Sequence, residues 1–103
     1  MTVQILIEAK ISDNIMTNFL QVDNESHRHA VPANSETHFK VVIVSDDFHG
    51  MSLIARHRLV NGLLKEELDG PVHALSLHTY TPSEWHVKNK NAMDSAGCLG
   101  GGK

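Results

Sequence analysis

The sequence predicts an α+β domain built around a small, mixed three-stranded sheet. Three observations support this: an apolar stripe at helical spacing near the start, a short polar loop over residues 27–36 between two strand patterns, and a long helical pattern before a third strand. A short loop joins antiparallel neighbours, whereas a helical crossover joins parallel ones. The second strand is therefore expected at the centre of the sheet, with the helices packed on one face.

The chain opens with a predicted helix over Thr2–Met16. Apolar residues recur there every four positions, which places them on one side of a helix, although the run Ile5–Ile7 is also compatible with a short strand. Asn18–Ser26 is predicted as the first strand and His27–Glu36 as a loop with several turn formers. The stripe of the helix consists of Val3, Ile7, Ile11 and Ile15.

The clearest strand pattern covers Thr37–Asp46. It is apolar on both faces, as is typical of a strand at the centre of a sheet or beneath a helix. Ser52–Leu68 follows as a predicted helix, and Gly62 is the point at which this helix is expected to bend or split. Its apolar side consists of Leu53, Val60, Leu63, Leu64 and Leu68.

The third strand is predicted between Gly70-Pro71 and Pro82. If it is regular, His73 shares its more apolar face with Leu75 and Leu77, at the end where the chain leaves the turn. A histidine at this position is either a packed core residue or a ligand held at the rim of the sheet.

A final short helix is predicted from Thr81. Thr81 is the expected cap, Pro82 stands in the first turn, and Glu84 lies three residues after the cap. Residues 1–88 are assigned to the folded domain, and residues 89–103, which end in a run of glycines, to a flexible tail.

Composition narrows the class of protein. Of the 103 residues, 41% are hydrophobic and 20% charged, as in soluble globular proteins, and the formal net charge of -3 argues against a surface built mainly to grip phosphates. The single cysteine, Cys98, excludes an internal disulfide and indicates a reducing compartment. No apolar run reaches membrane-spanning length and no signal-peptide pattern opens the sequence, so we expect a cytoplasmic location.

Several stretches, taken in order along the chain, resemble the BolA family. The resemblance runs from the first predicted strand to Trp85 and implies a fold similar to the class II KH domain, which agrees with the element order helix, strand, strand, helical segment, strand, helix. The stretches that carry it are Glu25–Pro32, Ser35–Lys40, Val44–Gly50, Arg56–Val60, Glu66–Leu68, Val72–Leu75 and Thr81–Trp85.

The resemblance implies a function that is not catalytic. BolA-like proteins pair with monothiol glutaredoxins, and the heterodimer can hold a [2Fe-2S] cluster that it shares with glutathione. By this resemblance the isolated chain holds no cofactor and is a monomer or a weak homodimer. A plainer alternative is an interaction module that binds the glutaredoxin without any cluster.

The resemblance also implies the cluster ligands. One is the histidine of the Val-His-Ala-Leu stretch, here His73, and the other is a residue of the loop between the first two strands, where His29 stands at the matching place and His27 is the fallback. Iron accepts imidazole in place of thiolate. The alternative is that His73 packs or caps at the strand end and that the loop histidines are simply solvated.

DNA binding is the alternative function, since bacterial members have been proposed to regulate the transcription of genes for cell shape and stress responses. The helix Ser52–Leu68 would then present Arg56, Arg58 and Lys65 to phosphates in weak, salt-sensitive contacts. The plainer account of Arg56 is a salt bridge with Glu67. The helix lacks the Gly-x-x-Gly clamp of an RNA-binding KH site, so RNA binding is not expected.

The remaining polar residues have structural explanations. The aspartates at 46 and 47 are expected to cap the turn or helix that follows, and His38 and Lys40 to lie on a solvated face of the sheet. Cys98 is expected to be an exposed thiol without a role. No nucleophile and base occur in a supporting context, so we expect no enzymatic activity.

Overall fold

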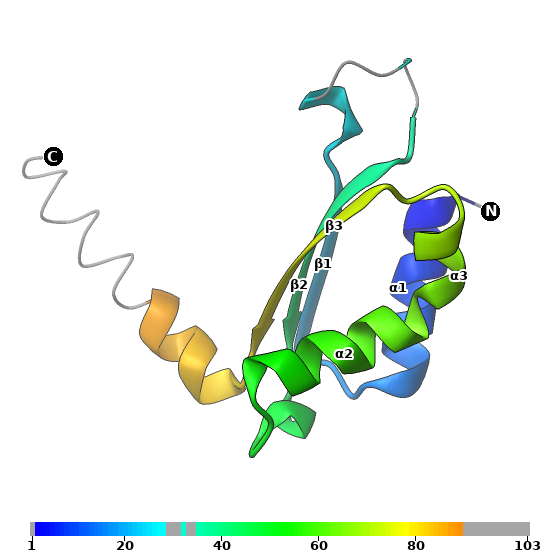
Figure 1. The fold of residues 1–103 in the computed structure, drawn as a ribbon. Coiled ribbons are helices and arrows are strands. Elements are labelled where there is room, and N and C mark those ends of the chain that lie inside the picture. The colour runs from blue at the N-terminus through cyan, green and yellow to red at the C-terminus, as the bar shows by residue number, and fades with distance from the viewer. Residues whose placement is uncertain (1, 29–31, 33–34, 90–103) are drawn as a thin grey trace, which may run out of the picture.

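The computed structural model describes residues 2–28, 32 and 35–89, and their α+β arrangement confirms the predicted fold class (Figure 1). Two 3-10 turns, η1 (Ser26–Arg28) and η2 (Asp46–Phe48), precede and follow the second strand, and residues 82–89 form a last helix. The other elements, in chain order, are α1 (Val3–Asn14), β1 (Phe19–Asn24), β2 (His38–Val44), α2 (Leu53–Leu63), α3 (Lys65–Asp69) and β3 (Ala74–Tyr80).

The sheet has β2 at its centre, as the connection lengths predict. β1 runs antiparallel to β2, with Val22 opposite Val41, and β3 runs parallel to β2, with Leu77 opposite Val41. Helices α1, α2 and α3 lie on one side of this sheet (Figure 1). The strands therefore have an inner face under the helices and an outer face that α1, α2 and α3 leave uncovered.

The predicted stripe of the first helix packs into the core. Ile7 and Ile11 are fully buried, and Ile15, just beyond the end of α1, is also buried. The Thr2 hydroxyl caps the helix by accepting a hydrogen bond from the backbone N–H of Ile5 at 3.2 Å. Residues 5–7 are helical, so the strand alternative for them is wrong.

The predicted helix Ser52–Leu68 divides in two, close to the expected weak point at Gly62. α2 ends at Leu63 and α3 begins at Lys65, with the buried side chain of Leu64 between them. The prediction that Leu53 belongs to the core is wrong, because its side chain is 61% exposed. Leu53 points in the same direction as the buried Val60, but it lies in the first turn of α2, before the level at which the helix meets the sheet.

The predicted salt bridge between Arg56 and Glu67 is also wrong. Glu67 instead forms an ion pair with Lys10 of α1, at 2.8 Å between Nζ and Oε2. The buried Arg56 pairs with Glu84 of the last helix, at 2.7 Å between Nη1 and Oε1. A helical wheel places Arg56 and Glu67 on the same side, but residues eleven positions apart lie about 16 Å apart along a continuous helix, which is too far for an ion pair.

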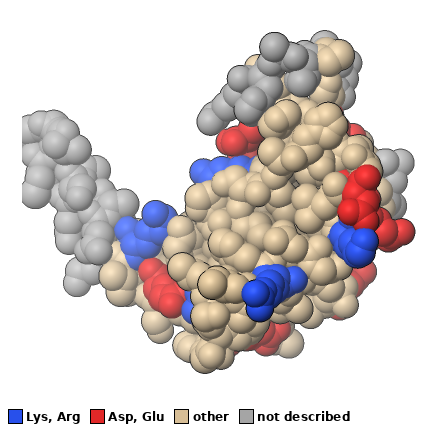
Figure 2. Space-filling model, viewed as in Figure 1, with Lys and Arg blue, Asp and Glu red and all other residues tan. Residues whose placement is uncertain are grey.

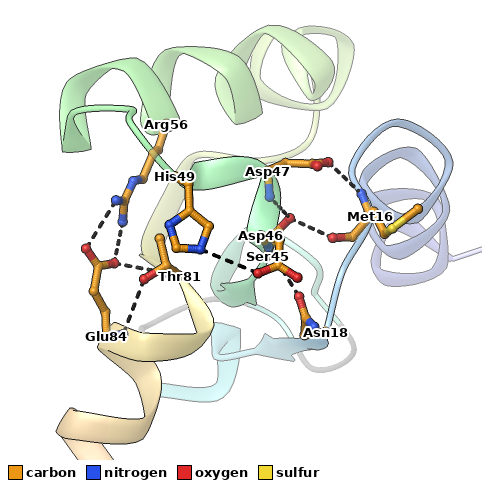
Figure 3. A network of polar contacts seen from close by, with 9 residues as sticks. All are labelled: Met16, Asn18, Ser45, Asp46, Asp47, His49, Arg56, Thr81 and Glu84. Atoms are coloured by element: carbon orange, nitrogen blue, oxygen red, sulfur yellow. Dashed lines mark hydrogen bonds and ion pairs between the residues drawn. The ribbon is translucent and has the colours of Figure 1, made fainter.

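The last helix begins with the predicted capping box. The backbone N–H of Thr81 donates to Oε1 of Glu84 at 2.8 Å, and the backbone N–H of Glu84 donates to the Thr81 hydroxyl at 3.2 Å (Figure 3). The predicted tail, apart from Asn89, lies outside the described residues. Across residues 2–28, 32 and 35–89, no helix has both the length and the apolar character needed to cross a bilayer.

The prediction that Asp46 and Asp47 cap the turn after β2 is wrong. Ser45 is the residue that caps η2, because its hydroxyl accepts the backbone N–H of Asp47 at 3.0 Å. The carboxylate of Asp47 accepts the backbone N–H of Met16 at 3.0 Å, and the Ser45 hydroxyl donates to the Met16 carbonyl at 2.6 Å (Figure 3). These bonds tie the end of α1 to the end of β2, and no catalytic arrangement is needed to explain them.

Candidate metal site

The candidate metal site lies where β2 and β3 begin, beside the loop that follows β1. Both strands start at this end of the sheet because they are parallel, with His38 opposite Ala74. The loop arrives at the same end because β1 runs antiparallel to β2, with Asn24 opposite Phe39. The topology therefore brings His73, His38 and the loop to one edge, although they are far apart in the sequence.

His73 stands immediately before β3 and is exposed. Its backbone N–H donates to the carbonyl of Thr37 at 2.8 Å, and the N–H of Ala74 donates to the same carbonyl at 3.1 Å. Leu75 and Leu77 pack against the core as predicted, but His73 precedes the regular strand and escapes burial. The packed-core alternative for His73 is therefore wrong, and the residue occupies the rim.

A second imidazole, that of His38, lies beside His73. The two ring centroids are 6.3 Å apart and the rings meet edge to face. Nδ1 of His38 is 2.8 Å from the Thr37 hydroxyl, a hydrogen bond that fixes the orientation of the ring. The sequence prediction treated His38 only as part of a solvated sheet face. The register of β2 against β3 is the signal that would have found it, since it sets His38 opposite the residue after His73.

Ser26 anchors the first end of the loop to the start of β2. Its buried hydroxyl accepts hydrogen bonds from the backbone N–H groups of Thr37, at 2.9 Å, and of His38, at 3.1 Å. The side-chain amide of Asn24 reaches across the loop to the carbonyl of Ser35 at 2.9 Å. The loop therefore leaves and re-enters the sheet from fixed positions.

Glu36 anchors the second end of the loop to the first helix. Its two carboxylate oxygens accept the backbone N–H groups of Val3 and Gln4, each at 3.2 Å. A carboxylate is favoured there because the first N–H groups of a helix lack partners within it and carry partial positive charge. The Glu36 carboxylate thereby links the second end of the loop to the start of α1.

The predicted loop ligands divide between described and undescribed positions. His27 lies in η1 and is exposed, whereas His29 lies outside the described residues. In the part of the chain that the structure describes, no three His, Cys, Asp or Glu side chains are grouped so that they could hold a metal ion. At this edge the described residues thus supply two adjacent imidazoles, those of His38 and His73, and no complete ligand set.

The three residues predicted for DNA contact differ in accessibility. Arg58 is exposed on α2, and Lys65 is exposed on α3 with its Nζ 2.6 Å from a carboxylate oxygen of Asp69. Arg56 is 5% exposed and is held by Glu84, so its guanidinium is not available to a phosphate. The face of the molecule seen in Figure 2 has scattered basic and acidic groups rather than one continuous basic patch.

Comparison with known proteins gives a consistent family. The profile of the BolA family, described as BolA-like protein, matches residues 11–84. The chain is 50% identical over 101 residues to the DNA-binding transcriptional regulator BolA of Vibrio cholerae, covering 98% of this chain and 95% of that protein. It is also 50% identical over 101 residues to BolA-like protein 1 of Mus musculus, covering 98% of this chain and 73% of that protein.

The fold agrees with that of a solved relative. The solution structure of the BolA1 protein from Mus musculus superposes with a TM-score of 0.78 at 48% sequence identity, covering 86% of this chain and 72% of that one. These relatives are named as a regulator or as BolA proteins, and none of the names denotes an enzyme.

Proposed function

The chain belongs to the BolA family, and we propose that it is a non-enzymatic adaptor that pairs with a monothiol glutaredoxin and shares a [2Fe-2S] cluster with it. The observation that carries the proposal is the exposed His73 at the rim of the sheet, with the His38 ring beside it and with His27 in the turn that follows β1 at the same edge. We place this function in the cytoplasm, in iron-sulfur trafficking or in iron and redox regulation.

The chemistry of these residues suits half of a cluster site. Iron in a [2Fe-2S] cluster accepts imidazole in place of thiolate, and histidine ligation raises the reduction potential. With Cys98 as its only cysteine, the chain cannot supply four thiolates. In the proposed complex His73 and a loop histidine, His29 or else His27, supply imidazoles. The glutaredoxin and its bound glutathione supply the thiolates.

The test is to reconstitute the cluster with a monothiol glutaredoxin and glutathione and to record the visible absorption and circular dichroism of the complex. His73→Ala is expected to abolish the mixed-ligand spectrum. His29→Ala, His27→Ala and His38→Ala decide which second imidazole is used. His49→Ala is the matched control, because His49 is an exposed histidine that follows the opposite end of β2.

Two outcomes would overturn the cluster proposal. If the His73→Ala complex keeps the wild-type spectrum and cluster lifetime, His73 is not a ligand. If the two proteins form a complex that takes up no cluster, the chain is an interaction module only.

A second candidate function is regulation of transcription through duplex DNA. The observation in its favour is that the Vibrio cholerae relative is named a DNA-binding transcriptional regulator. Exposed Arg58 and Lys65 would provide phosphate contacts, and Arg56 drops out because it is buried. Promoter binding that falls after the double substitution Arg58→Ala and Lys65→Ala would support this role. Binding that is equal for all sequences and vanishes near physiological salt would exclude it.

A further inference from the structure

The outer face of the sheet carries a mixed basic and aromatic surface that the proposed adaptor function does not use. Among the elements that the structure describes, the helix of residues 82–89 reaches this face, at the end where β2 and β3 finish. Because side chains alternate along a strand, the residues of this face follow from the register. They are Phe19, Gln21 and Asp23 of β1, His38, Lys40, Val42 and Val44 of β2, and Ala74, Ser76, His78 and Tyr80 of β3.

Trp85 builds an aromatic cluster at one end of this face. Its ring stacks on that of Phe19 with centroids 5.4 Å apart, and it meets the ring of Tyr80 at 5.2 Å. Phe19 and Tyr80 flank Val44 in the register, and Val44 is 1% exposed although it lies outside the core cluster. The cluster therefore closes the end of the outer face. In the next row, Val42 is 7% exposed between the exposed Gln21 and the half-buried His78.

A hollow of about 210 Å³ lies beside the aromatic cluster. Val42 lies at its centre in the strand register, between Gln21 on β1 and His78 on β3, and Tyr80 and Trp85 line it as well. This volume is smaller than the roughly 300–1,000 Å³ of pockets that enclose small-molecule ligands. It is of the size to seat one planar group.

Two lysines, Lys40 and Lys88, also line the hollow. Neither lysine makes an ion pair with another described residue, and Nζ of Lys88 lies 5.8 Å from the centroid of the Tyr80 ring. Asp23, whose carboxylate accepts a hydrogen bond from the Gln21 amide at 2.6 Å, is the one acidic side chain among the described strand residues of this face. The hollow is therefore aromatic and locally positive on a chain whose net charge is negative.

We propose that this hollow binds single-stranded nucleic acid, with one base against Tyr80 and Trp85 and the neighbouring phosphates near Lys40 and Lys88. Proteins that bind single strands combine a positive groove with aromatic rings on which bases stack. Duplex DNA does not fit this chemistry, because its bases are paired and stacked inside the helix. The site is separate from α2 and from the histidines at the other end of the sheet, so it does not depend on the adaptor function.

The test uses Trp85 as its own reporter, since it is the only tryptophan of the chain. The full chain is mixed at low salt with an oligothymidylate of twelve nucleotides. Trp85 fluorescence and the fluorescence anisotropy of a labelled form of the same oligonucleotide are followed. Quenching of Trp85 is expected to parallel the anisotropy change. Two lysine–phosphate contacts to a single strand predict a slope of about −1.4 in a plot of the logarithm of the association constant against the logarithm of the salt concentration. Loss of one lysine should make this slope shallower, at about −0.7.

Matched variants separate this face from the helical face. Lys40→Ala and Lys88→Ala are expected to weaken binding and reduce the salt slope, whereas Asp23→Asn is expected to strengthen binding. Tyr80→Leu removes an aromatic ring on which a base can stack. The loss of one such stacking contact is expected to decrease the affinity by roughly 5- to 150-fold. Arg58→Ala, an exposed cation on α2, is the control and should leave binding unchanged.

Four outcomes would overturn the proposal. An anisotropy change without any change in Trp85 fluorescence would place binding elsewhere, and a larger loss from Arg58→Ala than from the lysine variants would place it on α2. If a DNA duplex of the same length competes with the labelled oligonucleotide as well as the single strand does, the site does not recognise unpaired bases. Binding of thymidine monophosphate as tightly as the oligonucleotide would identify a free nucleotide, and not a strand, as the ligand.

Discussion

Arg56 of α2 and Glu84 of the last helix form a bidentate ion pair that joins two elements distant in the sequence. Nη1 of Arg56 lies 2.7 Å from Oε1 of Glu84, and Nη2 lies 3.2 Å from Oε2 (Figure 3). Nη1 also donates to the carbonyl of Thr79 at the end of β3, at 3.2 Å. One guanidinium thus holds α2, the last strand and the last helix together, and it keeps Trp85, the next residue, over the outer face of the sheet.

This ion pair predicts a pH-dependent contribution to stability. The Arg56 guanidinium, assisted by the backbone N–H of Thr81, lowers the pKa of Glu84 to about 2. Because the pKa in the folded state is below the unfolded value of about 4.3, the stabilisation is fully present above that unfolded value and is lost as the pH falls towards 2. Glu84→Gln is expected to lower the free energy of unfolding at pH 7 by about 1 kcal/mol, a value that allows for solvent screening at the partly exposed carboxylate.

Urea unfolding of wild type and Glu84→Gln at pH 7, 4 and 2 checks this prediction. The difference between the two proteins should shrink between pH 4 and pH 2, where Glu84 becomes protonated in the folded wild type. Asp13→Asn, which changes an exposed carboxylate in the last turn of α1, is the control. A difference that stays constant down to pH 2 would show that the ion pair does not stabilise the fold.

The division of the helical segment at Leu64 predicts opposite results for two leucines. Leu64 is 1% exposed and belongs to the core, whereas Leu53 is 61% exposed. Leu64→Ala is expected to destabilise the protein by about 2–5 kcal/mol, because it leaves a cavity, and Leu53→Ala to change stability by less than about 0.5 kcal/mol. Equilibrium urea unfolding measures both. Similar losses for the two variants would contradict the assignment of Leu53 to the surface.

The sequence was sufficient for the elements and the topology, because these depend on local signals. The stripe from Val3 to Ile15, the capping box at Thr81 and the lengths of the two connections are such signals, and the structure confirms the helix, the cap and the strand order that they predict. The packing of α2 was less predictable. A helical wheel gives the direction of a side chain but not the point along the helix at which contact with the sheet begins, so Leu53 was misplaced and the partner of Arg56 was missed.

Thr79 provides a test of a buried hydroxyl without a hydrogen-bond partner among the described residues. The residue is 4% exposed, and its Oγ1 makes no hydrogen bond to any described atom. Thr79→Val keeps the shape of the side chain and removes the unpaired group, so it is expected to stabilise the fold by up to about 1 kcal/mol. For a domain of this size, that corresponds to a rise in Tm of roughly 4–8 °C. A lower Tm in thermal unfolding would show that the hydroxyl is bonded in solution.

The candidate metal site was predictable only in part, because it depends on contacts between strands and not on the direction of side chains along one helix. The sequence indicated His73 and a histidine-rich loop, but nothing local in it distinguishes a rim residue from a packed one. That distinction follows from the position of His73 one residue before β3, where the regular strand has not yet begun. The neighbouring ring of His38 follows from the parallel register, which no single segment of the sequence contains.

Ser26 links the stability of the loop to the proposed function. Its hydroxyl, on a residue that is 3% exposed, accepts the backbone N–H groups of Thr37 and His38, and Ser26→Ala leaves both donors without this partner. A buried donor left unsatisfied costs about 1–3 kcal/mol, so we expect a loss of stability in that range and faster amide hydrogen exchange at these two residues. The start of β2 would then be less well fixed beside His73. The complex with a monothiol glutaredoxin should accordingly lose its cluster absorption faster than wild type, although every imidazole is retained.

Ser76→Ala, which changes an exposed serine whose hydroxyl contacts His78, serves as the control. Unchanged exchange at Thr37 and His38 in the Ser26→Ala protein would show that Ser26 does not anchor the site.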